Sequence, residues 1–131
     1  MSATITFNSY FTLKYSHIVE IHETTSVLDQ LVGCSTFDNC IFGIIDFREV
    51  HQLAYEKMDF QMHGAFINTL WKMKRRDDTF KLAYVVNDEE AVAWAERIQS
   101  SCQLDNCFKR QAIFMDFGQA INWGQDAKAQ C

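Results

Sequence analysis

The sequence predicts an α/β domain with a mixed, mostly parallel sheet, an antiparallel edge and about four helices. Three continuous apolar runs support this prediction, because strands covered on both faces read as unbroken apolar segments. The runs are Cys40–Asp46, Lys81–Asn87 and Arg110–Met115. Amphipathic segments lie between them, and this alternation is typical of a parallel sheet with crossover helices. A chain of 131 residues with 48% hydrophobic residues suffices for one core, so a single domain is expected over residues 1–131.

The beginning of the chain predicts the antiparallel edge of the sheet and one short helix. Apolar and polar residues alternate across Thr4–Tyr15, which is the period of a strand with one polar face, and the pattern breaks at Asn8–Ser9. A turn is expected at Ser16–His17, and His17–His22 is expected to continue as a strand. Apolar side chains then recur at helical spacing, which predicts a helix at about Ser26–Val32.

The remaining helices are predicted between and after the apolar runs. Their expected ranges are about Asp59–Arg76, Asn87–Ser100 and Gly118–Trp123. In the longest of them, apolar residues recur every three or four positions and predict one buried stripe. That stripe consists of Met62, Phe66, Leu70 and Met73.

Charge and cysteine content narrow the classes of partner and compartment. The formal net charge of -5 makes an acidic domain that repels a phosphate backbone, so no nucleic-acid partner is expected. The N-terminus has no basic region followed by an apolar run, and the run Cys40–Ile45 is far too short to cross a bilayer. Neither a signal peptide nor a membrane span is therefore expected. The five cysteines, an odd number, fit reduced thiols and a cytoplasmic location.

The order of the elements, in a chain of this length, resembles the SpoIIAA-like or STAS domain. Three segments carry the likeness: Ile44–Val50 as a strand that ends in Asp, Ala83–Asp88 as the next strand and helix cap, and Phe117–Trp123 as the closing helix. They are similar to small stand-alone STAS/SEC14-like bacterial proteins, and the likeness covers nearly the whole chain. The resemblance implies a SpoIIAA-like fold and a regulatory or binding role.

One segment departs from the pattern of regulatory STAS domains. Those domains carry a phosphorylatable Ser at the start of the helix that follows the central strand. The corresponding stretch here, Gln52–Asp59, contains no Ser or Thr. A phosphate switch at this helix would have no acceptor hydroxyl. The chain is therefore not expected to be a kinase-regulated anti-anti-sigma factor.

Three polar residues at the end of the predicted central strand are the first candidate site. Asp46, Arg48 and His51 lie where ligands of open α/β sheets tend to bind. A carboxylate, a guanidinium and an imidazole have the chemistry for acid–base work or anion binding. The alternative, which we favour, is that Asp46 and Arg48 are loop residues in a local ion pair or in local hydrogen bonds.

A second apolar line on the long predicted helix is the other candidate site. Phe60, Ile67 and Trp71 recur at spacings of seven and four, beside the expected core stripe. Most lines of this kind only widen the buried face of a helix. Alternatively, Phe60, Trp71 and the C-terminal tail residues form an exposed apolar patch, which would mark a protein partner, a lipid or a homodimer interface.

No pattern predicts a metal or a cofactor. His63 has no ligand type four positions later, and His17 and His22 are expected on opposite faces of a strand. The sequence has no Cys-x-x-Cys pair, no Gly-x-Ser-x-Gly elbow and no Gly-rich loop after a strand.

Three functions remain open. The favoured one is a non-enzymatic STAS-like module that binds a protein partner or a small apolar ligand through its helix-rich face. The second is a SEC14-like carrier of a lipid or small molecule, which would need a cavity lined by Phe and Met. The third is an enzyme that uses Asp46, Arg48 and His51.

Overall fold

The computed structural model describes residues 3–73, 80–102 and 110–126. The strands form one five-stranded sheet in the order β1-β2-β3-β4-β5. The β1–β2 pair is antiparallel and every other neighbouring pair is parallel, which confirms the predicted mixed α/β class. The elements in chain order are β1 (Ala3–Phe7), β2 (Phe11–Val19), α1 (Ile21–Val32), a 3-10 helix (Ser35–Asn39), β3 (Phe42–Leu53), α2 (Lys57–Met73), β4 (Lys81–Val85), α3 (Glu89–Cys102), β5 (Gln111–Phe114) and α4 (Phe117–Gln125).

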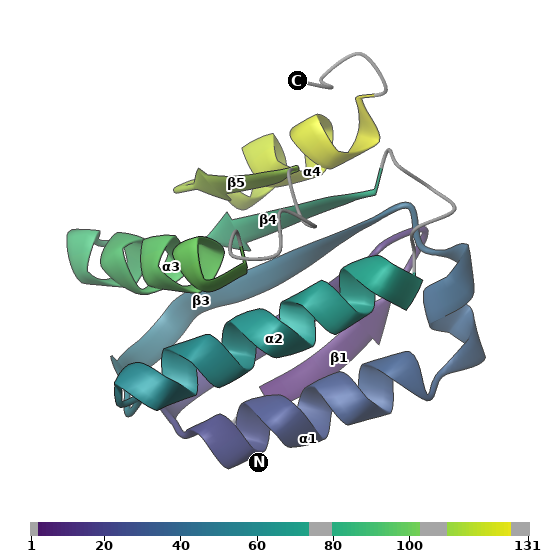
Figure 1. The fold of residues 1–131 in the computed structure, drawn as a ribbon. Helices are drawn as coiled ribbons and strands as arrows, with labels where there is room; N and C mark the ends of the chain where they lie inside the picture. The colour runs from purple at the N-terminus through teal and green to yellow at the C-terminus, as the bar shows by residue number, and fades with distance from the viewer. Residues whose placement is uncertain (1–2, 74–79, 103–109, 127–131) are drawn as a thin grey trace.

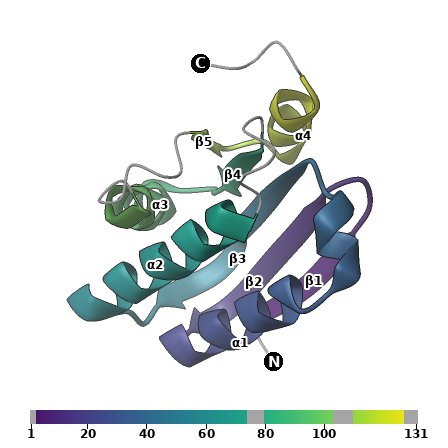
Figure 2. The same ribbon diagram turned by 45° about the vertical axis from the view of Figure 1, so that its right-hand side comes forward.

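Helices cover the two faces of the sheet unequally. The helices α1, α2 and α3 lie side by side on one face, whereas α4 packs on the other face (Figures 1 and 2). Alternate residues of each strand therefore enter two separate cores. The larger core fills the space under the three helices and includes Leu13, Ile45 and Tyr84. The smaller core, between the sheet and α4, includes Ile44 and Ala120.

Two glycines, one in each core, allow an aromatic ring to pack directly against their backbone atoms. Gly43 of β3 pairs with Phe11 of β2, and a Cβ atom at Gly43 would lie 2.0 Å from the Phe11 ring. In the smaller core, a Cβ atom at Gly124 of α4 would lie 2.3 Å from the Phe42 ring. Both distances are far below van der Waals contact, so the packing of each core depends on the missing side chain.

A buried lysine fastens the end of α4 to the sheet. Lys81 of β4 is 2% exposed, and its Nζ donates hydrogen bonds to the carbonyl oxygens of Trp123 at 2.7 Å and Asp126 at 2.5 Å. The ammonium also lies 5.0 Å from the centroid of the Trp123 ring. A cation at this position satisfies carbonyls at the end of the helix and complements the helix dipole.

The first helix begins earlier than the sequence predicts. β2 ends at Val19 and α1 begins at Ile21, so the strand expected over 17–22 is confirmed only as far as Val19, and the helix start expected at Ser26 is wrong. Glu20 and Glu23 form a reciprocal capping box, in which each side chain accepts a hydrogen bond from the other residue's backbone N–H. This box satisfies two backbone donors at the start of the helix.

The turn expected at Ser16–His17 is an irregularity within β2. Pairing with β3 continues on both sides of it, with register shifts between Lys14 and Ser16 and between His17 and Ile18. His17 has a φ of 62°, the left-handed conformation that non-glycine residues seldom adopt. The strand therefore bulges where the local sequence indicates a turn.

The buried stripe of α2 differs from the expected one. Met62 is 45% exposed and Phe66 is half-buried, whereas Phe60, His63 and Ile67 are buried. The inward-facing line thus runs along a neighbouring side of the helix and includes a histidine. The side chains of Leu70 and Met73 lie outside the described residues.

Substitution of Gly43 by Ala tests the close approach of Phe11. We expect Gly43→Ala to lower the free energy of unfolding by about 1–3 kcal/mol, because the new methyl group overpacks the core. Phe11→Leu should recover part of this loss in the double variant. Gly118→Ala is the control, since its Cβ would lie no closer than 3.6 Å to a neighbour. Urea unfolding curves measure all four proteins, and wild-type stability of Gly43→Ala would contradict the packing described.

Candidate functional site

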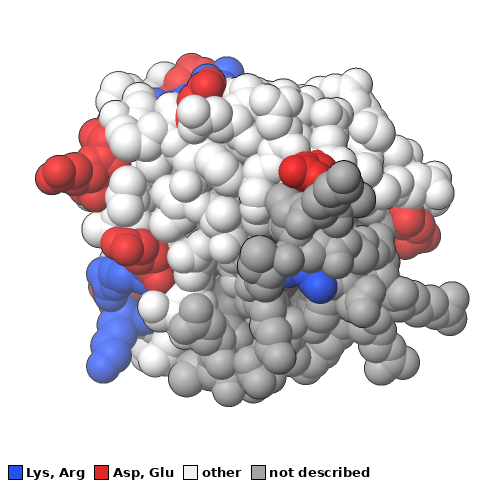
Figure 3. All heavy atoms as spheres, turned by 90° about the horizontal axis from the view of Figure 1, so that it is seen from above, with Lys and Arg blue, Asp and Glu red and all other residues white. Residues whose placement is uncertain are grey.

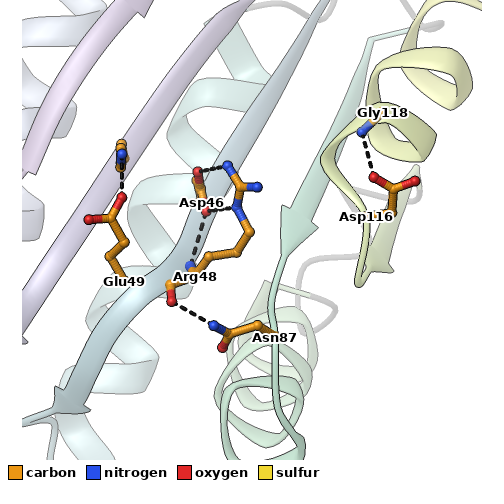
Figure 4. A network of polar contacts seen from close by, with 7 residues as sticks. Asp46, Arg48, Glu49, Asn87, Asp116 and Gly118 are labelled. Carbon is orange, nitrogen blue, oxygen red and sulfur yellow. Dashed lines mark hydrogen bonds and ion pairs between the residues drawn. The ribbon is translucent and has the colours of Figure 1, made fainter.

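Asp46 and Arg48 form a closed pair at the end of the parallel part of the sheet. Asp46 pairs with Val85, the last residue of β4, so it lies where only β2 and β3 continue. Its carboxylate is buried and accepts hydrogen bonds from Arg48 Nε at 3.0 Å and Nη2 at 2.9 Å (Figure 4). The Arg48 backbone N–H donates to the same carboxylate at 3.0 Å. Both carboxylate oxygens are therefore occupied by one neighbouring residue.

Contacts from two other segments hold this pair in place. The Arg48 guanidinium lies 4.9 Å from the centroid of the Phe117 ring, in the first turn of α4. Asn87, which follows β4, donates its Nδ2 hydrogen bond to the Arg48 carbonyl oxygen at 2.8 Å (Figure 4). The hydrogen bond with Asp46 raises the pKa of Arg48 above its ordinary value. Arg48 is thus a fixed, permanently charged partner of Asp46.

The neighbouring charges on this face of the sheet are also paired. Lys14 of β2 forms an ion pair with Glu49 of β3 (Figure 4). Both side chains are about half exposed, so the pair adds little to stability. In the view from above in Figure 3, the described charged side chains are scattered singly or in small groups.

His51 is not part of the Asp46–Arg48 pair. Its exposed ring stacks on the ring of His17, with 5.9 Å between the centroids. The structure therefore brings together two of the three polar residues expected at the strand end, and it turns the third toward the bulge of β2. Asp46 and Arg48 form the local ion pair that we favoured, but the expectation that they are loop residues is wrong, because β3 continues through both of them to Leu53.

The apolar line on α2 does not form an exposed patch in the described residues. Phe60 is 4% exposed and Ile67 is fully buried, so these two side chains widen the buried face of the helix. The expectation of an exposed patch that includes Phe60 is wrong, because Phe60 packs under Arg97 of α3. The side chain of Trp71 lies outside the described residues.

A groove between α2 and α3 is a hollow in the helix layer that could receive a ligand. It has a volume of about 390 Å³, near the small end of the range for ligand pockets. The Arg97 guanidinium stacks over the Phe60 ring at 3.9 Å from the centroid and forms part of its wall. Within the described ranges, neither Arg97 nor Lys57 forms an ion pair. The lining residues are Lys57, Phe60, Gln61, Ala93, Glu96, Arg97, Ser100 and Ser101.

The sequence alone did not identify this groove. Among the lining residues, the sequence singles out Phe60, as part of a line that widens the buried face of the helix or, alternatively, of an exposed patch. Arg97 and Lys57 lie on different helices, and only the packing of α3 against α2 brings them to one surface. A contact between a cation on one helix and an aromatic ring on another does not produce a periodic pattern in the sequence.

A buried chain of polar groups lies beneath α1 and α2. The Tyr55 hydroxyl is hydrogen-bonded both to Thr24 Oγ1 and, at 2.9 Å, to His63 Nδ1. His63 Nε2 is buried and has no hydrogen-bond partner in the described part of the chain. Desolvation lowers the pKa of His63 to about 3 and raises the pKa of Tyr55. This histidine is therefore neutral in the folded protein at physiological pH.

One group of metal-ligand side chains occurs in the described residues. Glu20, His22 and Glu23 place one ligand atom each within 4.8 Å of one another. Both glutamates already cap α1, and the electropositive start of a helix opposes a bound cation. The cluster is explained by helix capping.

Two cysteine side chains lie in the described part of the chain. Cys40 is 3% exposed and packs as a small core residue, and Cys34 is half-buried. The sulfhydryl of Cys40 donates to the carbonyl oxygen of Thr36 at 3.5 Å. The side chains of Cys102, Cys107 and Cys131 lie outside the described residues.

Comparison of the chain with protein-family models, with curated proteins and with solved structures found no match. Among the helices within the described ranges, none combines the length and the apolar character needed to cross a bilayer. The functional interpretation therefore depends on the geometry of the chain's own residues.

His63 predicts a specific dependence of stability on pH. An unfolded chain binds a proton at this histidine below a pKa near 6.5, whereas the folded chain does so only near 3, so stability falls as the pH drops through this window. Between pH 7.5 and 5 the wild type should lose about 2 kcal/mol more than His63→Gln. Urea unfolding at both pH values measures this, with the exposed His22→Gln as control. Equal losses in the wild type and His63→Gln would contradict the burial of a neutral His63.

Proposed function

We propose that the chain is a non-enzymatic, STAS-like module that binds a protein partner through the α2–α3 groove of its helix layer. The observation that carries this proposal is the groove itself, in which the Arg97–Phe60 contact and Lys57 lie among exposed polar side chains of two helices. The paired polar residues at the strand end support the same conclusion. A buried carboxylate that is fully engaged by Arg48 is poorly placed to exchange protons with a substrate.

The lining of the groove favours a protein partner over a lipid. A lipid carrier of the SEC14-like kind needs a cavity lined by apolar side chains such as Phe and Met. The groove contains one aromatic residue, Phe60, and no methionine. Its remaining side chains are mostly polar or charged, which is typical of the rim of a protein interface.

The order of the elements supports the SpoIIAA-like assignment. From β2 to α4 the chain is a series of consecutive strand–helix units, and neighbours along the chain are neighbours in the sheet. The odd number of cysteines in the sequence agrees with reduced thiols, and we place the protein in the cytoplasm. The stretch 52–59 offers no hydroxyl for phosphorylation, so partner binding would not be under the control of a kinase at this helix.

Filling the groove tests the proposal. Ala93 of α3 is exposed and lines the groove, so Ala93→Trp should obstruct it without disturbing the core. Ala65 of α2 is also exposed but does not line the groove, and Ala65→Trp is the matched control. Proteins captured from a lysate of the source cells by the wild-type protein would be identified and purified, and their affinities measured by calorimetry.

We expect Ala93→Trp to weaken the binding of a captured partner by about tenfold or more, because it blocks the centre of the interface, and Ala65→Trp to leave it unchanged. Equal affinity of Ala93→Trp and the wild type would contradict a partner site in the groove. Turnover of a metabolite by the purified protein, lost in Asp46→Asn, would contradict the non-enzymatic assignment.

A further inference from the structure

We infer that the α2–α3 groove recognises an acidic segment of the partner, with Arg97 and Lys57 as the residues that bind its carboxylates. This inference rests on the proposed function and names the chemistry of the partner. Lys57 lies in the first turn of α2 and Arg97 lies on α3, and both side chains line the groove.

Lys57 and Arg97 form no ion pair within the described residues, in contrast to Arg48 and Lys14. Arg48 is paired with Asp46, Lys14 with Glu49, and Lys81 with carbonyl oxygens at the end of α4. Within the described ranges, no carboxylate lies within ion-pair distance of Lys57 or Arg97. Their charges are therefore available to an anionic ligand.

The stack on Phe60 holds Arg97 in an orientation suited to a carboxylate. The guanidinium carbon lies 3.9 Å from the centroid of the Phe60 ring, and Phe60 is itself fixed by a T-shaped contact with Tyr55 at 5.1 Å. A cation–π contact does not use up the N–H donors of the guanidinium, which can still donate hydrogen bonds to a carboxylate. Less side-chain entropy is then lost when a carboxylate binds.

The surroundings of the two cations add further attraction. Lys57 lies in the first turn of α2, where the helix dipole favours negative charge, although Asp59 of the same turn already places a carboxylate there. Gln61 of α2 and Ser100 of α3 add neutral hydrogen-bond donors to the lining. Glu96 is the one acidic residue of the lining, so two cations face one anion there.

Local attraction is needed because the chain as a whole repels acidic ligands. Its formal net charge of -5 gives an acidic peptide no long-range attraction to the surface. An acidic segment would therefore bind only where cations are concentrated and unpaired. This makes binding of such a peptide a selective probe of the groove.

The test uses a fluorescently labelled hexaglutamate peptide and the full-length chain at low ionic strength, with binding measured by fluorescence anisotropy. We expect Arg97→Gln and Lys57→Gln each to weaken binding by about fivefold or more, and added salt to weaken it in the wild type. Arg97→Lys keeps the charge but loses the planar fork, so its affinity should lie between those of the wild type and Arg97→Gln. Lys14→Gln, on the opposite face of the sheet, is the matched control and should bind as the wild type does.

Several outcomes would overturn the inference. They are no binding of hexaglutamate by the wild type, equal binding by Arg97→Gln, and an equal loss in Lys14→Gln. Competition by inorganic phosphate at the same concentration as unlabelled hexaglutamate would also overturn it, because the groove would then be a site for a small free anion. Circular dichroism checks that each variant is folded.

The inference and the proposed function can fail separately. A captured partner that loses affinity with Ala93→Trp but keeps it with Arg97→Gln would overturn the acidic segment and leave the groove as the partner site. A partner that keeps its affinity with both variants would contradict the two together.

Discussion

The pairing of a buried carboxylate with an adjacent arginine governs how the strand ends of this protein are organised. Asp46 lies in the middle strand of the sheet and is 2% exposed. A buried carboxylate of this kind is stable only when a cation or hydrogen-bond donors lie against it. Arg48 supplies two side-chain hydrogen bonds and one backbone hydrogen bond to it. Through Arg48 the pair reaches the Phe117 ring of α4 and the Asn87 side chain after β4. One ion pair thus joins three segments at the point where ligands of α/β sheets usually bind.

Because the charged groups around Asp46 are paired, the charged groups without an ion pair that our proposal uses lie in the helix layer. At the strand end, the charges of Asp46 and Glu49 are matched by neighbouring cations, and His51 is stacked on His17. Between α2 and α3, by contrast, two cations line one groove without an internal partner in the described residues. A protein that binds through this layer needs no reactive group at the strand ends, in agreement with the function that we propose.

The sequence predicts the fold well where burial on both faces determines the pattern. The apolar runs in β3, β4 and β5 identify the parallel part of the sheet, and the alternation across Thr4–Tyr15 identifies its antiparallel edge. The start of α1 was missed because its capping box is made by two glutamates, which are less usual N-cap residues than Ser or Thr. The stripe of α2 was misplaced because Met62 satisfies helical spacing and yet faces solvent, while the core at this level admits His63.

The candidate site was less predictable than the fold. Asp46 and Arg48 were found because both lie on one strand, two positions apart, where the sequence shows their proximity. The Arg97–Phe60 stack joins residues far apart in the chain, and its geometry follows from how α3 packs on α2. Periodicity describes one helix at a time, so a groove between two helices cannot be read from it.

A double-mutant cycle on Asp46 and Arg48 tests most directly whether this pair is structural. The free energies of unfolding of Asp46→Asn, Arg48→Gln and the double variant would be measured in urea and compared with that of the wild type. We expect a coupling energy of about 1–2 kcal/mol, reduced from that of a fully buried pair because Arg48 is partly exposed to solvent. A coupling energy within about 0.5 kcal/mol of zero would mean that the two residues act independently, and would contradict the structural role assigned to the pair.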